Sequence, residues 1–154
     1  MFNIFTNKTE EFIFKFLYGF VNKYKYNIVR IRIRKQHKIY LCQIMIEKKN
    51  NKLININDCS KMNNNIISLN KGLKGICIEI SSTGLNKPLT RNTDLIISIG
   101  SIIKIYTLYK IGNQKKFKGQ LHKVYKTSIK IFILNSLKYK EISLHSISEI
   151  FLQY

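Results

Sequence analysis

The chain has 154 residues, of which 27 are Lys or Arg and 8 are Asp or Glu, so its formal net charge is +19. Hydrophobic residues make up 45% of the chain, which excludes a wholly disordered protein and predicts at least one buried core. One Pro, seven Gly and no Trp exclude collagen-like and Pro-rich sequences. No apolar run reaches the roughly 18 residues of a membrane span, and the N-terminus lacks the pattern of a secretory signal. We therefore expect a cytoplasmic protein with no membrane partner.

The positive charge attracts polyanions such as RNA, but composition accounts for part of it. Lys, Ile and Asn number 23, 28 and 16, and Ala is absent. The codons of the three abundant residues are poor in G and C, which indicates a genome rich in A and T. A field from a charge of +19 still favours nucleic acid or anionic lipid at low salt.

The first half of the chain predicts the order helix, strand, strand, helix, strand. The expected ranges are a helix over 7–23, an antiparallel hairpin of strands over 27–35 and 39–48, a helix over 56–69 and a strand over 75–81. Asn7 with Glu10, and Asn55 with Asp58, have the spacing of helix caps. In the first strand Val29, Ile31 and Ile33 are expected on one face, with Arg30, Arg32 and Arg34 on the other.

The second half predicts a separate, strand-rich domain. Residues 81–92 hold the only Pro and no apolar periodicity, so the predicted division is an N-terminal domain over 1–84, a linker over 85–92 and a C-terminal domain over 93–154. After a short turn at 92–97, strands are expected over 102–109, 116–125, 127–134, 139–144 and 148–152. Five short strands favour a small barrel, so the predicted fold class is α+β.

The sequence offers no catalytic or metal-binding constellation that we would defend. His37, His122 and His145 are scattered, eight acids leave few carboxylate pairs, and nucleotide-binding and nucleophile motifs are absent. The three cysteines, at 42, 59 and 77, form no CxxC pair, so we expect small buried hydrophobes in a reducing compartment. We therefore expect no enzyme activity, no cofactor and no metal.

Basic clusters are the better candidates for function. The arginine ladder Arg30, Arg32 and Arg34 places three cations about 7 Å apart, near the spacing of phosphates, although a plain solvated sheet face is equally plausible. Lys116 and Lys118 flank Phe117, which we expect to point inward. The linker carries two more candidate contact residues, Lys87 and Arg91, because loops often carry function.

One segment resembles a known signature. Residues 78–89 read IEISSTGLNKPL, and the members that match the pattern are Ser81, Ser82, Gly84, Leu85, Pro88 and Leu89. Thr83 stands where the pattern has Pro, and Lys87 where it has Arg. The pattern is that of the ribosome maturation factor RimP family. Residues 55–59, 99–105, 116–121, 142–144 and 147–150 resemble further parts of the same family, in the same order.

The resemblance implies a KH-like N-terminal domain of the order α-β-β-α-β and an SH3-like (Sm-like) C-terminal β-barrel. It implies a non-enzymatic, monomeric assembly factor that binds the free small (30S) ribosomal subunit. Such a factor assists late 16S rRNA folding and protein incorporation, and contacts the small-subunit ribosomal protein near the decoding centre. The binding residues would be Arg30, Arg32, Arg34, Lys87, Arg91, Lys116 and Lys118.

Three alternatives stay open. The chain could be a generic basic RNA-binding protein or a permanent ribosomal protein, which would share its charge and strands. An enzyme acting on RNA would need a cluster of acids, bases or metal ligands. A membrane-surface role is the weakest alternative, because the basic alternation is strand-like and lacks a strong helical pattern.

Overall fold

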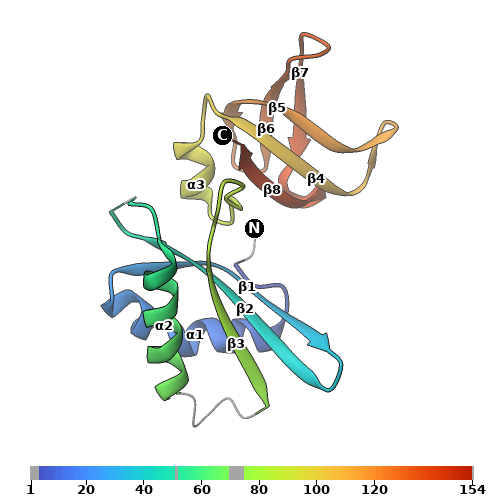
Figure 1. Ribbon diagram of the computed structural model, residues 1–154. Helices are drawn as coiled ribbons and strands as arrows, with labels where there is room; N and C mark the ends of the chain where they lie inside the picture. Colours follow the sequence, from blue (N-terminus) through green and yellow to red (C-terminus); the bar gives the residue numbers. More distant parts are fainter. Residues whose placement is uncertain (1–3, 51, 70–74, 154) are drawn as a thin grey trace. The chain divides into compact units, whose positions relative to one another are not determined.

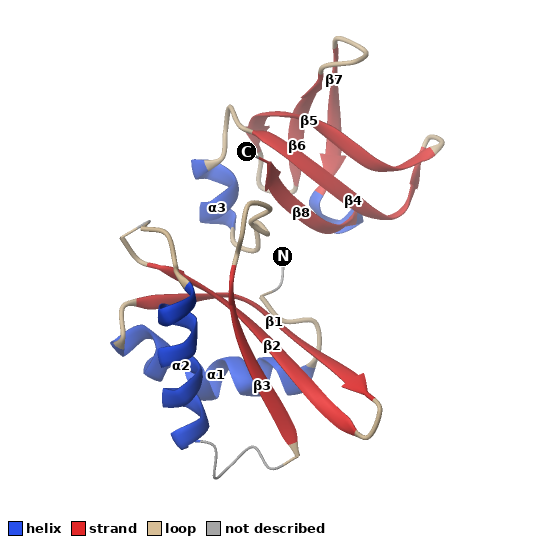
Figure 2. Ribbon diagram, in the orientation of Figure 1, coloured by secondary structure: helices blue, strands red, loops and turns tan. Residues whose placement is uncertain are grey.

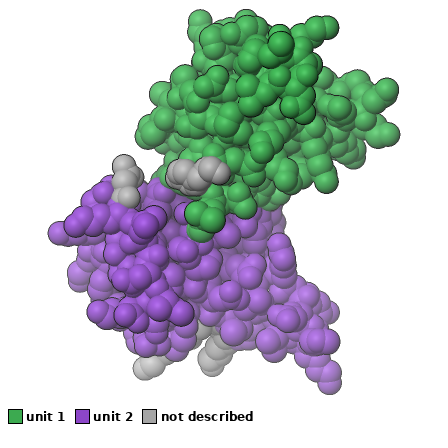
Figure 3. All heavy atoms as spheres, turned by 45° about the horizontal axis from the view of Figure 1, so that its top comes forward, with its two compact units in different colours: residues 1–3, 84–154 green, residues 4–83 purple. Residues whose placement is uncertain are grey.

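The computed structural model describes residues 4–50, 52–69 and 75–153. It is an α+β protein with two separate sheets (Figures 1 and 2). The chain forms two compact units: an N-terminal unit of residues 4–83, and a C-terminal unit that includes residues 84–154 (Figure 3). Each unit has its own hydrophobic core.

The N-terminal unit contains the five predicted elements, each within two residues of its expected bounds. They are α1 (Lys8–Lys23), β1 (Tyr26–Gln36), β2 (Ile39–Lys48), α2 (Ile56–Leu69) and β3 (Ile76–Ser82). The strand order is β1-β2-β3, with β2 antiparallel to β1, which confirms the predicted hairpin. β3 pairs with β2 in parallel, and α2 lies between these two strands in the sequence.

Both helices pack on one face of this sheet. Because side chains alternate along a strand, every second residue of β1, β2 and β3 reaches the helices. The buried cluster consists of Ile13, Leu17, Val21, Ile28, Ile31, Cys42, Ile44, Ile46, Met62, Ile66, Ile78 and Ile80. The opposite face of the sheet is mixed, and its members include Arg30, Arg32, Gln43, Met45, Cys77, Glu79 and Ser81.

A β-bulge changes the expected phase of β1. Ile28 pairs with Ile46 and Arg30 with Met45, so Val29 is an extra residue between them. Ile28 consequently joins the core with Ile31, whereas Val29 was expected to do so. A bulge of one residue shifts every side chain before it to the other face, and alternation in the sequence does not reveal it.

Side chains cap both helices, in two different ways. At α2 the Asn55 amide oxygen accepts from Asp58 N at 2.8 Å and Asp58 Oδ2 accepts from Asn55 N at 3.0 Å, which is a full capping box. Asp58 also binds Lys48 Nζ at 2.7 Å and the Tyr26 hydroxyl at 3.0 Å. Lys48 above all, with the Asn55 and Tyr26 hydrogen bonds, lowers the pKa of Asp58 to about 2. The Asp58 carboxylate therefore connects α2 to β1 and β2.

At α1, the Asn7 side-chain oxygen accepts from Glu10 N. The Glu10 carboxylate does not complete a capping box with Asn7 and instead accepts from Ile33 N on β1.

The C-terminal unit begins with a short helix where a turn was expected. This helix is α3 (Asn92–Ile97). Its N-cap residue is Arg91, whose backbone N–H donates to Asp94 Oδ2 at 3.1 Å. Five strands follow, all matching predicted ones: β4 (Ile102–Ile111), β5 (Gln114–Val124), β6 (Ser128–Ile133), β7 (Lys138–Ser143) and β8 (Ile147–Gln153). A 3₁₀ turn, η2 (Leu144–Ser146), joins β7 to β8.

These strands form one antiparallel sheet in the order β7-β6-β5-β4-β8, and within the described residues the edge strands β7 and β8 do not pair to close it into a barrel. β8 does not pair with β7, because residues 87–89 occupy its outer edge. Leu89 N donates to Ile150 O at 2.9 Å, and Leu152 N donates to Lys87 O at 2.8 Å. Between them, Pro88 and Phe151 form an isolated antiparallel β-bridge. Part of the predicted linker is therefore built into the C-terminal unit. The sheet packs over a core whose members are Leu89, Leu95, Ile103, Ile105, Phe117, Leu121, Ile129, Ile131, Ile142, Leu144, Ile147 and Ile150.

The cysteines do not share one environment. Cys42 is buried beneath the helices, and burial raises the pKa of its thiol to about 12. Cys59 is half-buried on α2. Cys77 is exposed, so the expectation of a buried residue is wrong there. It alternates with Ile76 and Ile78 along β3 and thus faces away from the helices.

Candidate nucleic-acid interface

The open face of the N-terminal sheet brings together two features that the sequence separates by fifty residues. Arg30 pairs with Met45 on β2, and Met45 pairs with Ser81 on β3, so the three lie in one row across the sheet. In the next row Arg32 pairs with Gln43. These five residues line a shallow hollow. The first arginine of the ladder thus lies beside the first residue of the Ser81–Leu89 motif.

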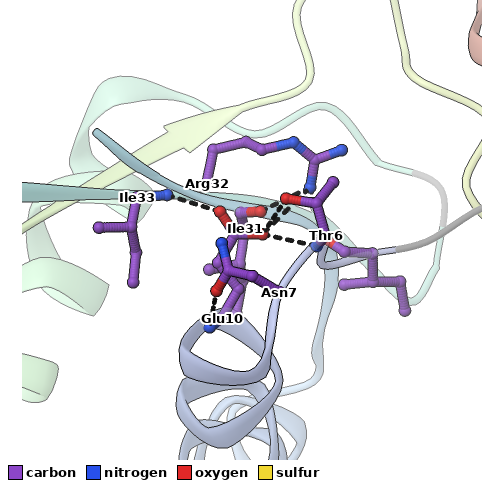
Figure 4. A network of polar contacts seen from close by, with 7 residues as sticks. Thr6, Asn7, Glu10, Ile31, Arg32 and Ile33 are labelled. Atoms are coloured by element: carbon purple, nitrogen blue, oxygen red, sulfur yellow. Dashed lines mark hydrogen bonds and ion pairs between the residues drawn. The ribbon is translucent and has the colours of Figure 1, made fainter. Parts of the chain in front are cut away.

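Arg32 is anchored in a polar network at the start of α1 (Figure 4). Its Nη1 donates to the carbonyl oxygens of Ile31 at 2.6 Å and Ile4 at 3.0 Å, and lies 3.8 Å from Glu10 Oε2. Glu10 also accepts from Thr6 N at 2.6 Å, Thr6 Oγ1 at 2.8 Å and Ile33 N at 2.9 Å. The guanidinium therefore holds the chain before α1 against β1.

Glu10 is a buried, fully hydrogen-bonded carboxylate, with only 2% of it exposed. Burial alone would raise its pKa, but the Ile33 and Thr6 hydrogen bonds and the Arg32 charge outweigh burial and hold the pKa below its ordinary value. Glu10 is thus charged at neutral pH and offsets part of the Arg32 charge. The three arginines of the ladder differ: Arg30 lines the hollow, Arg32 is tied to Glu10, and Arg34 is exposed towards the hairpin turn.

Lys87 and Arg91 come together around a second buried carboxylate. Asp94, 5% exposed, accepts from Arg91 Nε at 2.9 Å and Nη2 at 2.7 Å, and Lys87 Nζ lies 3.7 Å from it. Two parallel hydrogen bonds to one carboxylate fix an arginine firmly. These two predicted contact residues thus anchor residues 87–91 to α3, with a local charge of 2 − 1 = +1.

The rest of the Ser81–Leu89 motif spans the boundary between the units. Ser82 ends β3 opposite Ile46, and Gly84 follows at φ +60°, a left-handed conformation that favours glycine. Leu85 is exposed, whereas Pro88 and Leu89 are buried against β8. Each half of the motif is therefore part of a folded unit.

Lys116 and Lys118 lie on the outer face of β5, and Phe117 between them points into the core as expected. Opposite them on β4 are Tyr106 and Lys104. Lys104 Nζ and Lys116 Nζ lie 5.4 and 5.7 Å from the centre of the Tyr106 ring, within cation–π range. Aromatic and basic side chains thus interleave on this sheet face, as in proteins that bind single-stranded nucleic acid.

A second aromatic group on the same sheet is not evident from the sequence. The Tyr139 ring lies 4.8 Å from the His122 ring and 5.0 Å from the Phe132 ring, and Lys130 Nζ lies 4.8 Å from its centre. The three rings come from β7, β5 and β6. Alternation along β5 could have placed His122 outside, but only the register of three strands brings Tyr139 to it.

Across residues 4–50, 52–69 and 75–153, no three His, Cys, Asp or Glu side chains gather in a way that could hold a metal ion. None of the described helices is long and apolar enough to span a membrane. No family model matches the chain.

Proposed function

We propose that this protein is an assembly factor of the RimP type, which binds the free small ribosomal subunit and assists late folding of its 16S rRNA. The proposal extends to a cytoplasmic monomer without enzymatic activity, with a KH-like N-terminal unit and an SH3-like C-terminal unit whose sheet is open. The element order α1-β1-β2-α2-β3 and the five antiparallel strands support that assignment.

The observation that carries the proposal is the position of the Ser81–Leu89 motif. Ser81 lies in the hollow with Arg30 and Arg32, and Leu89 is in the core of the other unit. If these residues formed only a flexible linker, they would not need to lie in the sheet of one unit and the core of the other. Here its residues are built into both units, and its first residue, Ser81, lies beside Arg30 of the ladder.

The mechanism would be chaperoning of RNA by two basic surfaces. The open face of the N-terminal sheet offers Arg30 and Arg34 to phosphates, and the outer face of the C-terminal sheet offers lysines and rings. Residues 91–154 alone carry 11 − 3 = +8. Two modest sites on one chain raise each other's effective concentration, so binding can be firm and yet reversible. A contact with a ribosomal protein near the decoding centre is part of the same proposal.

The test is co-sedimentation of the purified protein with free small subunits, intact ribosomes and naked 16S rRNA, at low and moderate salt. Phosphate contacts weaken steeply with salt, so binding by charge alone should be lost from all three targets together. An assembly factor should stay on free small subunits at moderate salt and bind intact ribosomes little.

Two results would replace the proposal. Equal, salt-sensitive binding to all three targets would indicate a generic basic RNA-binding protein. Retention on intact, translating ribosomes would indicate a permanent ribosomal protein.

A further inference from the structure

The outer face of the C-terminal sheet carries an aromatic cluster that folding alone does not require. We define the aromatic cluster as Tyr139, Phe132 and His122. Tyr139 is 53% exposed although its ring contacts both neighbours. His122 is exposed as well, and Phe132 is half-buried. The sheet buries its opposite face in the core, so these rings lie on its outer side.

The cations around the cluster are arranged for a polyanion. Lys130 lies over the Tyr139 ring. Along the outer face of β5, the residues before His122 in the same phase are Lys116, Lys118 and Gln120. Alternate residues of a strand are about 6.6 to 7 Å apart, close to the spacing of successive phosphates in an extended single strand. Lys116 and Lys118 thus lie on the same strand face as His122, with the neutral Gln120 between Lys118 and the ring. Glu141, which pairs with Lys130, accepts a hydrogen bond from Ser128.

We infer that this face is a stacking platform for single-stranded nucleic acid, with bases on the aromatic cluster and the backbone along Lys118 and Lys116. The inference rests on the proposed function in that it makes the ligand an unpaired segment of rRNA. Rings and cations together suit a base and its phosphate, whereas a duplex keeps its base faces inside. An anionic membrane could use the cations too, and is tested as the competing ligand.

The first experiment uses the wild-type chain, so it does not depend on how a variant folds. A 12-nucleotide oligouridylate is titrated into the protein while the ring-proton signals of the histidines are followed by NMR. The platform predicts that the His122 signals shift and that those of His37, in the β1–β2 turn, do not. Shifts at His37 equal to those at His122, or none at His122, would overturn the inference.

The second experiment measures affinity for the labelled oligouridylate and for an RNA duplex of equal length. Tyr139→Leu should weaken binding of the single strand about tenfold, because one base loses its stacking partner. It should leave duplex binding and the salt slope unchanged. Lys118→Gln should instead lower the slope by about 0.7, because it removes one phosphate contact to a single strand. Tyr139→Phe keeps the ring and should bind like wild type.

The matched control is Tyr18→Leu, since Tyr18 on α1 is 52% exposed and also contacts a neighbouring ring. It should not change affinity. An equal loss in Tyr18→Leu and Tyr139→Leu, or an equal loss for duplex and single strand, would contradict stacking. Tyr139-dependent binding to phosphatidylglycerol vesicles with no binding of oligouridylate would assign the face to a membrane and overturn the inference.

These outcomes separate the platform from the proposed function. If oligouridylate binding depends on Tyr139 but the protein fails to sediment with small subunits, the platform stands and the ribosomal assignment falls. If Tyr139→Leu sediments with free subunits as wild type does and no oligouridylate binds, the platform falls and the assignment stands.

Discussion

The two units present positive charge in different ways. On the open sheet face of the N-terminal unit the ladder cations are arginines, and one of them is held by the buried Glu10. On the outer face of the C-terminal sheet several cations are lysines beside aromatic rings, such as Lys130 over Tyr139. Arginine with fixed geometry suits defined phosphate positions, whereas lysine over a ring suits a flexible strand. Net charge alone does not distinguish these surfaces, but the local partners of each cation do.

The largest expected effect tests the close approach of β5 and β6, the strands that carry His122 and Phe132 of the aromatic cluster. A Cβ atom at Gly119 would lie 2.5 Å from the carbonyl oxygen of Phe132, so Gly119→Ala should force β5 away from β6. We expect a loss of about 3 kcal/mol in the free energy of unfolding, measured by urea denaturation with circular dichroism. The control is Gly19→Ala in α1, where a Cβ meets nothing within 4 Å. It should stabilise the N-terminal unit by about 0.5–1 kcal/mol, because Ala favours a helix. An undiminished stability in Gly119→Ala would contradict the close approach of the strands.

The next effect tests the anchor of the N-terminal unit. Glu10→Gln removes the charge that holds Arg32 and two backbone N–H groups, and should destabilise the unit by about 2 kcal/mol. Glu11→Gln is the control, because Glu11 pairs with Lys15 at the surface, and its substitution should cost less than about 0.5 kcal/mol. Equal stabilities of the two variants would rule out the anchoring role.

The same anchor predicts a pH dependence. The pKa of Glu10 is lower in the folded chain than its ordinary value of 4.5. The contribution of the Glu10 charge to the free energy of unfolding is therefore complete above about pH 4.5. It is lost as the pH falls through the pKa of Glu10 in the folded chain. The difference in stability between wild type and Glu10→Gln should shrink in that acid range. A difference that stayed constant with pH would contradict a charged Glu10.

The smallest expected effect concerns the matching anchor of the C-terminal unit. Asp94→Asn takes the carboxylate from Arg91 and Lys87 and should cost about 1 kcal/mol. The cost is smaller than at Glu10 because the Glu10 carboxylate also accepts from the backbone N–H groups of both Thr6 and Ile33, whereas Asp94 accepts from that of Arg91. Urea denaturation measures it. A loss larger than that of Glu10→Gln would reverse the expected order.

Local patterns in the sequence predicted most elements correctly, because alternation and helical spacing report directly on which side chains are buried. They could not reveal features that depend on distant partners. The bulge at Val29 depends on the register with β2, and the pairing of residues 87–89 with β8 joins segments sixty residues apart. The short helix α3 was predicted as a turn. Its first turn is held by the hydrogen bond from Arg91 N to Asp94, which the local pattern did not reveal.

The candidate site divides in the same way. The arginine ladder and the inward Phe117 follow from alternation alone, and Lys116 and Lys118 lie outside for the same reason. The carboxylates that hold Arg32, Lys87 and Arg91 were not foreseen, because hydrogen-bond geometry is invisible in composition. Nor was the aromatic cluster, which three strands contribute.

We propose that binding to the small subunit depends on where the positive charges lie, rather than on how many there are. The most direct measurement compares Arg30→Gln with Lys61→Gln in binding to free small subunits across a salt series. Both remove one charge, but Arg30 lines the hollow on the open sheet face, whereas Lys61 is an exposed residue of α2. The account predicts weaker binding and a salt slope lower by about one for Arg30→Gln, and no change for Lys61→Gln. Equal losses in the two variants would contradict it.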